Sequence, residues 1–333
     1  MSGEYRGGRS EQKNHVKLVV TIDTEEDNWG SFSLTRYTFE NIARIPGLQE
    51  MFDSFNVTPT YLLTYPVATD EKAVSILKAI SDADKCEIGA HCHPWNTPPF
   101  GEEKNARNSM LCNLPADLQY AKLKYLQETI REHFGVDPIS FRSGRFGYNT
   151  TVARNLHRLG YKIDTSITPY TNWTRSHGTD FTRLSPRPFR FARDNAFEEC
   201  AGGDLIEVPV TVGFLQRDFS RSNYIFEAVT RSPINKLRLT GLLCRLRLVN
   251  KVWLSPEVSD SRTMIRLAQT MSRNGYPILN LVFHSPGLKA GLTPFTRTEA
   301  EEKRFLQRLQ EFLVFGRDAG FEPIRLSEVQ TLV

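Results

Sequence analysis

Cysteine is scarce in this chain of 333 residues, and what there is forms no recognisable pattern. The five cysteines are odd in number and include no CxxC pair, which favours reduced thiols over a disulfide framework. Residues 1–17 contain no apolar stretch of the signal-peptide type, and no apolar run in the chain is long enough to span a bilayer. We therefore expect a cytoplasmic protein.

Strong charge and sequence repetition are also missing. The formal net charge is only +4, which by itself gives no reason to expect nucleic acid as a partner. Hydrophobic residues make up 40% and charged residues 24%, as in ordinary globular proteins. No repeat, low-complexity linker or shift in composition marks a second domain. The sequence predicts a disordered, Gly-rich tail over residues 1–15 and one domain over residues 16–333.

Short apolar segments alternate with amphipathic ones along the rest of the chain. This alternation predicts a parallel sheet with helical cover, and the number of units favours a distorted (β/α)7–8 barrel over an open sheet. We expect strands at residues 17–23, 58–65, 86–92, 138–143, 162–167, 205–211, 278–284 and 323–327. We expect helices at residues 37–54, 70–83, 115–134, 149–159, 259–274 and 296–319. The long connections 168–204 and 212–258 are expected to be functional or to carry structure of their own.

Two histidines follow one of the predicted strands, in the segment Glu-Ile-Gly-Ala-His-Cys-His-Pro-Trp. His91 and His93 are two residues apart, so in a strand both imidazoles point to the same face. Imidazole is a common ligand of divalent metals, which also take carboxylates. An acidic run after the first predicted strand, at residues 23–27, could supply one. Taken singly, a His pair is often structural and an acidic run often caps a helix, but both lie where α/β folds place their chemistry.

Two further segments place polar residues at predicted strand ends. Arg142 opens the run Arg-Ser-Gly-Arg-Phe-Gly and could orient a carboxylate or bind an anionic group. His284 ends the apolar strand Ile-Leu-Asn-Leu-Val-Phe-His and is placed to act as a general acid or base. A surface arginine in a turn and a hydrogen-bonded core histidine are the simpler interpretations of each segment alone.

Taken together and in this order, these segments resemble the polysaccharide deacetylase family, the NodB-homology carbohydrate esterases. The resemblance covers roughly residues 17–329, and the wording around residues 91–99 and 283–288 is similar to a bacterial branch found with exopolysaccharide genes. It implies a distorted β/α barrel and metal-dependent removal of an acetyl group from a sugar. By this resemblance Asp23 is the general base, His91 a metal ligand, Arg142 the residue that holds the base, and His284 the acid that protonates the leaving amine.

The sequence departs from the family pattern at two ligand positions. Where the family commonly has a second aspartate as metal ligand, this chain has Thr24, so Glu25 is the nearest substitute unless Asp23 itself binds the metal. Where the second histidine is usual, four residues after the first, the chain has Trp95, so His93 has to serve. We expect a divalent metal held by Glu25, His91 and His93, with zinc first and cobalt, nickel or manganese as alternatives.

Aromatic residues near the predicted strand ends suit stacking on a sugar, although packing is the simpler explanation for any one of them. From these we expect Trp95, Phe146 and Tyr148 to bind substrate. Residues 231–254 carry six basic residues and no acid between leucines, which fits either peripheral contact with an anionic membrane or a basic helix that covers the barrel.

The expected function is a cytoplasmic sugar deacetylase of polysaccharide or envelope metabolism, acting on a carbohydrate or a lipid-linked sugar, either free in the cytoplasm or peripheral to the inner membrane face. Two alternatives remain. One is a metal-independent amide or ureide hydrolase on the same barrel, which the altered ligand spacing permits. The other is a catalytically silent carbohydrate-binding protein, against which the presence of both Asp23 and His284 argues. The sequence does not indicate the oligomeric state.

Overall fold

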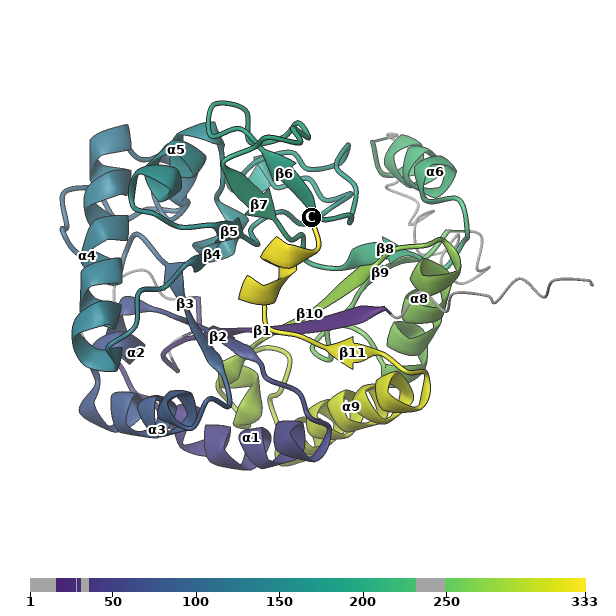
Figure 1. Cartoon of the computed structure of the whole chain (residues 1–333), viewed down its shortest axis with the longest axis horizontal. Coiled ribbons are helices and arrows are strands. Elements are labelled where there is room, and N and C mark those ends of the chain that lie inside the picture. The colour runs from purple at the N-terminus through teal and green to yellow at the C-terminus, as the bar shows by residue number, and fades with distance from the viewer. Residues whose placement is uncertain (1–15, 28, 31–35, 232–248) are drawn as a thin grey trace, which may run out of the picture.

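A curled sheet forms the centre of the molecule, and helices cover its outer face (Figure 1). The computed structural model describes residues 16–27, 29–30, 36–231 and 249–333. The sheet runs in the order β10-β1-β2-β3-β4-β5-β7-β6, and β11 pairs with β1. Its strands are β1 (Lys17–Thr24), β2 (Thr60–Leu63), β3 (Glu87–Cys92), β4 (Ser140–Ser143), β5 (Ile163–Asp164), β6 (Phe189–Phe191), β7 (Leu205–Glu207), β10 (Ile278–His284) and β11 (Glu322–Pro323).

All neighbours in this sheet are parallel except β6 and β7. The chain beyond β7 closes much of the gap between the two ends of the sheet, because Val210 N–H donates to Ile167 beside β5 and Thr211 N–H donates to Asn280 of β10. A short antiparallel pair, β8 (Val212–Phe214) and β9 (Lys251–Trp253), continues from there. The expected distorted, mostly parallel α/β barrel is confirmed.

Alternate residues of the strands point into the barrel and form layers along its axis. Leu18, Val20 and Ile22 of β1 belong to the large apolar core under the helices, whereas Val19 packs inside with residues of β5, β7 and β10. The 3-10 helix Ser327–Thr331 near the C-terminus closes this apolar layer through Val329. Two residues further along β1 and β10, the side chains inside the barrel are polar. Here the Thr21 hydroxyl donates to Asn280 Oδ1 at 2.8 Å. The reactive residues lie above this layer, at the carboxyl ends of the strands.

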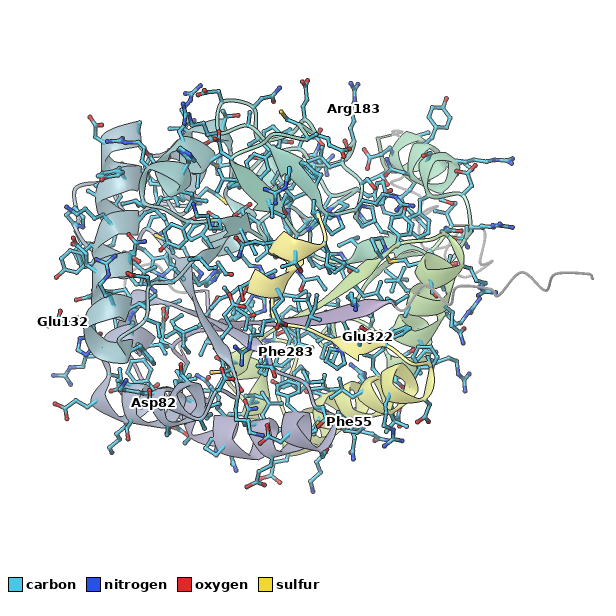
Figure 2. The ribbon with its side chains drawn as sticks, in the orientation of Figure 1. Phe55, Asp82, Glu132, Arg183, Phe283 and Glu322 are labelled. Carbon is cyan, nitrogen blue, oxygen red and sulfur yellow. The ribbon has the colours of Figure 1, made fainter. Side chains whose placement is uncertain are left out.

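The helices follow the predicted pattern closely where their amphipathic character is strong. They are α1 (Ile45–Ser54), α2 (Tyr65–Thr69), α3 (Glu71–Asp82), α4 (Ala116–Phe134), α5 (Thr150–Arg158), α6 (Phe219–Arg231), α8 (Ser261–Arg273) and α9 (Glu299–Asp318). Helix α4 ends at Gly135, which has φ 74° and so takes the left-handed conformation that glycine tolerates. In Figure 2 the charged side chains labelled on the helical cover, Asp82 and Glu132, reach outward, while Phe283 lies fully buried.

Several element boundaries differ from the expectation. The helix expected over 37–54 begins at Ile45, because Pro46 suits the first turn of a helix and the preceding residues form contacts with the loop after β1. Strands β6, β8 and β9 and helices α2 and α6 were not predicted. Each of these strands has only three residues, too few for a hydrophobic period to show.

Two expectations concern residues outside the described part of the chain. The predicted disordered tail, residues 1–15, lies wholly outside it, and so does most of the basic segment 231–254. None of the helices within the described ranges combines the length and the apolar character needed to cross a membrane.

Candidate active site

A buried ion pair joins the ends of β1 and β4 at the top of the barrel. Arg142 Nη1 lies 2.5 Å from Asp23 Oδ1, and both side chains are almost completely buried. The guanidinium is held on its other sides by the Thr165 carbonyl at 2.9 Å from Nε and by Thr21 Oγ1 at 2.6 Å from Nη2. Because residues of β1 and β4 and the residue after β5 contribute to this arrangement, Asp23 Oδ1 is fixed in place, and Oδ2 is the oxygen that faces the histidines.

Asp23 is charged despite its burial. Burial by itself would raise the pKa of this carboxyl, but the positive charge of Arg142, with smaller contributions from His91 and His284, outweighs it and lowers the pKa. Asp23 Oδ2 lies 3.9 Å from His91 Nε2 and 3.5 Å from His284 Nε2. A carboxylate in this position can accept a proton from a molecule bound between the two imidazoles.

The Glu25 carboxylate lies between the imidazole of His91, which belongs to β3, and the imidazole of His93, just after the end of that strand. Its Oε1 is 3.0 Å from His91 Nε2 and 3.3 Å from His93 Nε2. These three residues could hold a metal ion, since each offers one ligand atom and the atoms lie within 4.8 Å of one another. Burial would raise the pKa of Glu25, but His93 and His91 outweigh it and hold the pKa well below its ordinary value. The carboxylate is therefore available as an anionic ligand.

A hydrogen bond on the far side of His91 fixes its ring so that Nε2 faces Glu25. Nδ1 of His91 lies 3.0 Å from the backbone carbonyl of Arg142, which can only accept, so Nδ1 carries the proton. Burial alone would lower the pKa of His91, but Asp23 and Glu25 outweigh it and raise the pKa, so Nε2 also holds a proton and directs it at Glu25. A metal ion bound there would take the place of that proton. Two imidazoles and one carboxylate leave further coordination positions open, as catalytic metal sites require.

Close packing fixes the second imidazole. The Trp95 ring stacks on His93, with ring centroids 4.2 Å apart and an interplanar angle of 24°. Gly144 lies so close that a Cβ there would be 2.0 Å from His93 Cδ2. Trp95 thus supports His93 from the position where the family pattern has a histidine. Thr24 is fully buried and donates its hydroxyl to the Ile22 carbonyl, so it takes no part in the cluster.

The remaining acids of residues 23–27 have structural roles. Glu26 accepts hydrogen bonds from Thr64 at 3.0 Å and from Asn96 at 2.8 Å, which ties the loop after β1 to the loop after β3. Asp27 accepts from the backbone N–H groups of Glu40 and Asn41, at 2.7 and 3.0 Å. The acidic run therefore divides into two residues that face the site and two that shape the loops.

His284 reaches the site from β10, whose register places it directly beside Asp23 of β1. Its Nδ1 lies 3.0 Å from Oε2 of Glu257, a residue that the sequence analysis did not single out. Burial would lower the pKa of His284, but Glu257 outweighs it and raises the pKa to about 10. His284 is therefore an imidazolium at neutral pH and can donate a proton. Little in the sequence points to Glu257, because it lies in the long connection 212–258 and follows a strand of only three residues.

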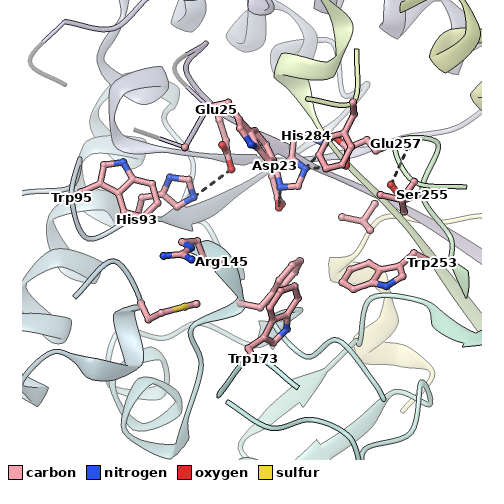
Figure 3. A pocket seen from close by; sticks show the side chains of 17 residues that line it. Asp23, Glu25, His93, Trp95, Arg145, Trp173, Trp253, Ser255, Glu257 and His284 are labelled. Atoms are coloured by element: carbon pink, nitrogen blue, oxygen red, sulfur yellow. Dashed lines mark hydrogen bonds and ion pairs between the residues drawn. The ribbon is translucent and has the colours of Figure 1, made fainter. Parts of the chain in front are cut away.

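A cavity of about 510 Å³ opens above these groups. Figure 3 shows His93, Glu25 and Asp23 along one side of it, with His284 beyond them. Trp95 and Phe146, for which the sequence predicts a role in substrate binding, line the cavity, and so does Arg145.

Tyr148 corrects the sequence analysis. It is fully buried, does not line the cavity and packs edge-on against Phe197, with ring centroids 6.3 Å apart. A substrate in the cavity cannot reach its ring. Its place near a predicted strand end suggested contact with substrate, but the chain turns at Phe146, which has φ 57°, and Tyr148 packs into the core instead.

No family model and no curated protein matches the sequence. Solved structures do match the fold. A candidate polysaccharide deacetylase from Mycobacterium smegmatis superposes with a TM-score of 0.55 at 16% identity, over 96% of this chain and 91% of that one. The chain has a polysaccharide deacetylase fold. A candidate glycoside hydrolase/deacetylase from Parabacteroides distasonis gives a TM-score of 0.60 at 11% identity, over 96% of this chain and 71% of that one.

The same fold also occurs in a protein of different chemistry. The 4-alpha-glucanotransferase from Thermococcus litoralis superposes with a TM-score of 0.55 at 12% identity, over 96% of this chain and 40% of that one. The fold alone therefore does not identify the reaction, which has to be inferred from the side chains at the carboxyl ends of the strands.

Proposed function

We propose that this protein is a metal-dependent hydrolase that removes an acyl group from a sugar, with an N-acyl sugar as the principal substrate. The observation that carries the proposal is the placement of Asp23, whose Oδ1 is fixed by Arg142 and whose Oδ2 faces His91 on one side and His284 on the other. A fixed base and an acid that border the same site are what amide hydrolysis needs.

Glu25, His91 and His93 would hold the metal, for which zinc is the first choice and cobalt, nickel and manganese are alternatives. A divalent cation there lowers the pKa of water and polarises an acyl carbonyl. The donor set of two imidazoles and one carboxylate supports this assignment, as does the protonation of His91 on the nitrogen that faces away from the cluster.

Asp23 and His284 divide the proton transfers. Asp23, which its cationic neighbours keep ionised, takes the proton of the attacking water. His284 gives its proton to the nitrogen of the leaving sugar, so that the nitrogen departs as a neutral amine. Glu257 keeps His284 protonated and orients its ring so that Nε2 faces the cavity.

Acetate release from N-acetylglucosamine oligomers tests the proposal directly. Activity should be lost when metal is removed by a chelator and should return with zinc or cobalt. Asp23→Asn should keep the fold and lower kcat by about 10²–10⁴, because an amide cannot accept the proton of water. Asp194→Asn, which alters an exposed ion pair, is the matched control and should keep wild-type activity.

Elemental analysis separates this proposal from its closest alternative. Full activity in protein that contains no metal would show a metal-independent amide hydrolase instead. Wild-type kcat in Asp23→Asn would show that Asp23 is not the base, and a chain that binds sugar without any turnover would be a binding protein.

The cellular setting remains a prediction from the sequence. We propose a role in polysaccharide or envelope metabolism on the cytoplasmic side, with residues 231–254 in contact with the membrane. The six basic residues of this segment are its only support, and co-sedimentation with anionic liposomes at low and high salt tests it.

A further inference from the structure

The cavity above the catalytic groups has an unusually apolar lining for a site that would hold a sugar. The whole chain contains four tryptophans, and all four line this one cavity: Trp29, Trp95, Trp173 and Trp253. Phe146 stacks on Trp173 at 5.8 Å between ring centroids and lies 5.9 Å from Trp253, so these three rings form a continuous wall. Figure 3 shows Trp173 and Trp253 across the cavity from Asp23 and Glu25.

Aliphatic and further aromatic side chains extend this surface from the interior to the mouth. Met110 and Val282 are buried cavity-lining residues, and Phe295 packs edge-on against Trp29 with ring centroids 5.7 Å apart. Val258 lies at the rim, where its side chain is 56% exposed although it lines the cavity. An exposed valine at the entrance is suited to contact with an apolar ligand.

The polar groups of the described lining are largely engaged with one another. Ser255 Oγ accepts the N–H of Glu257 at 3.4 Å, and the Glu257 carboxylate is bound to His284. Arg145 donates to Ser109 and to a backbone carbonyl outside the cavity. A sugar ring buried here would leave most of its hydroxyls without partners, each at a substantial cost in affinity. The hydroxylated part of a substrate is better placed at the mouth, in water.

The size of the cavity also exceeds what an acetyl group needs. A cavity of about 150 Å³ lined by apolar side chains is enough to hold benzene. The present cavity, about 510 Å³, leaves most of its volume and nearly all of its aromatic wall without contact to a substrate that carries only acetyl.

We propose that the preferred substrate carries a large apolar group close to the bond that is cleaved, and that the wall of Phe146, Trp173 and Trp253 binds this group. The proposal rests on the hydrolase function above and specifies its substrate class. The apolar group has two chemical sources: an acyl chain longer than acetyl, or an apolar aglycone on the sugar that leaves.

Two substrate series distinguish these sources with the metal-loaded enzyme. In the first, glucosamine carries N-acetyl, N-butyryl, N-hexanoyl or N-benzoyl groups; in the second, N-acetylglucosamine carries a methyl, butyl or octyl aglycone. Each buried methylene is worth up to about fourfold, so kcat/KM should rise at least tenfold from the shortest to the longest member of one series. A rise in the first identifies the acyl group as the source, and a rise in the second identifies the aglycone.

Tryptophan fluorescence provides a measurement that does not depend on turnover. Because every tryptophan of the chain lines the cavity, a ligand that enters it should change the emission. Octyl glucoside below its micellar concentration and N-hexanoylglucosamine are the apolar probes, and methyl glucoside and N-acetylglucosamine are their polar counterparts. An apolar probe should bind at least tenfold more tightly than its counterpart.

Two variants keep the test independent of folding. Val258→Asp, at the exposed rim, should reduce the preference for the apolar probe several-fold, whereas Tyr224→Asp, at an exposed aromatic residue that does not line the cavity, should leave it unchanged. Equal binding of apolar and polar probes, or kcat/KM that falls along both series, would overturn the proposal and leave the hydrolase function standing. Tight apolar binding without turnover of any substrate would support the binding site and overturn the hydrolase function.

Discussion

The buried pair of Arg142 and Asp23 allows a quantitative test of how the site is held together. We consider Arg142→Met and Asp23→Asn, singly and combined. Each single change leaves a partner buried and without its counter-charge, which typically costs about 3–5 kcal/mol. Both side chains are no more than 2% exposed, so water cannot replace the missing partner. The double variant removes both charges, and we expect the two changes to couple by about 3 kcal/mol.

The loss of stability caused by Arg142→Met should depend on pH in a defined direction. In the wild type the pKa of Asp23 is lowered, so its contribution to stability is present above its ordinary pKa of 3.8 and is lost as the pH falls through the lower folded value. In Arg142→Met, burial loses its main counterweight, so we expect the pKa of Asp23 to rise. The difference in stability between wild type and Arg142→Met should therefore shrink as the pH falls and Asp23 takes up a proton.

Urea denaturation at pH 7.5 and at pH 4.5, with chelator present, measures the four free energies of unfolding. An exposed pair in the same chain is the matched control. Arg154 Nε lies 2.6 Å from Asp194 Oδ1, but the side chains are 51% and 65% exposed, so the cycle of Arg154→Met and Asp194→Asn should give less than about 1 kcal/mol. Additive effects of Arg142→Met and Asp23→Asn, or a coupling no larger than the control, would refute the reasoning.

Three further changes test other parts of the site. Glu257→Gln should lower the pKa of His284 from about 10, so the alkaline limb of the kcat/KM profile should move to lower pH by about 1–3 units, because the acid is lost as the pH rises. Gly144→Ala places a Cβ 2.9 Å from His93 Nε2 and should weaken metal binding about tenfold or more, as calorimetry can measure. Lys122→Met removes a buried ammonium that donates to three carbonyls of the loop after β3 and should cost about 3–5 kcal/mol by urea denaturation.

The glycine and lysine changes each have a control in the same chain. Gly47→Ala has nothing within 4 Å of the new Cβ and should leave metal affinity unchanged. Lys124→Met breaks only an exposed contact of 3.6 Å to Glu128 and should alter stability by less than about 1 kcal/mol. If the alkaline limb does not move in Glu257→Gln, this carboxylate does not set the protonation of His284. If metal affinity is unchanged in Gly144→Ala, His93 is not a metal ligand.

The sequence by itself was sufficient to place the residues at the strand ends. Parallel strands rich in apolar residues are recognisable from composition, and their carboxyl ends meet at one side of a barrel. The two-residue period of a strand then orients His91 and His93 alike. The register confirms the consequence, because Asp23 pairs with His284 and His91 pairs with Arg142 across neighbouring strands.

What the sequence could not decide depends on contacts between segments far apart in the chain. Glu25 and Glu26 are neighbours, yet one faces the histidines and the other binds Thr64 and Asn96, because the loop after β1 turns between them. Glu257 reaches His284 only through the packing of a strand too short to leave a periodic signal. The cavity that all four tryptophans line is likewise a product of packing: local periodicity orients a side chain, but only the curled sheet and the loops at its strand ends bring residues 29, 95, 173 and 253 around one cavity.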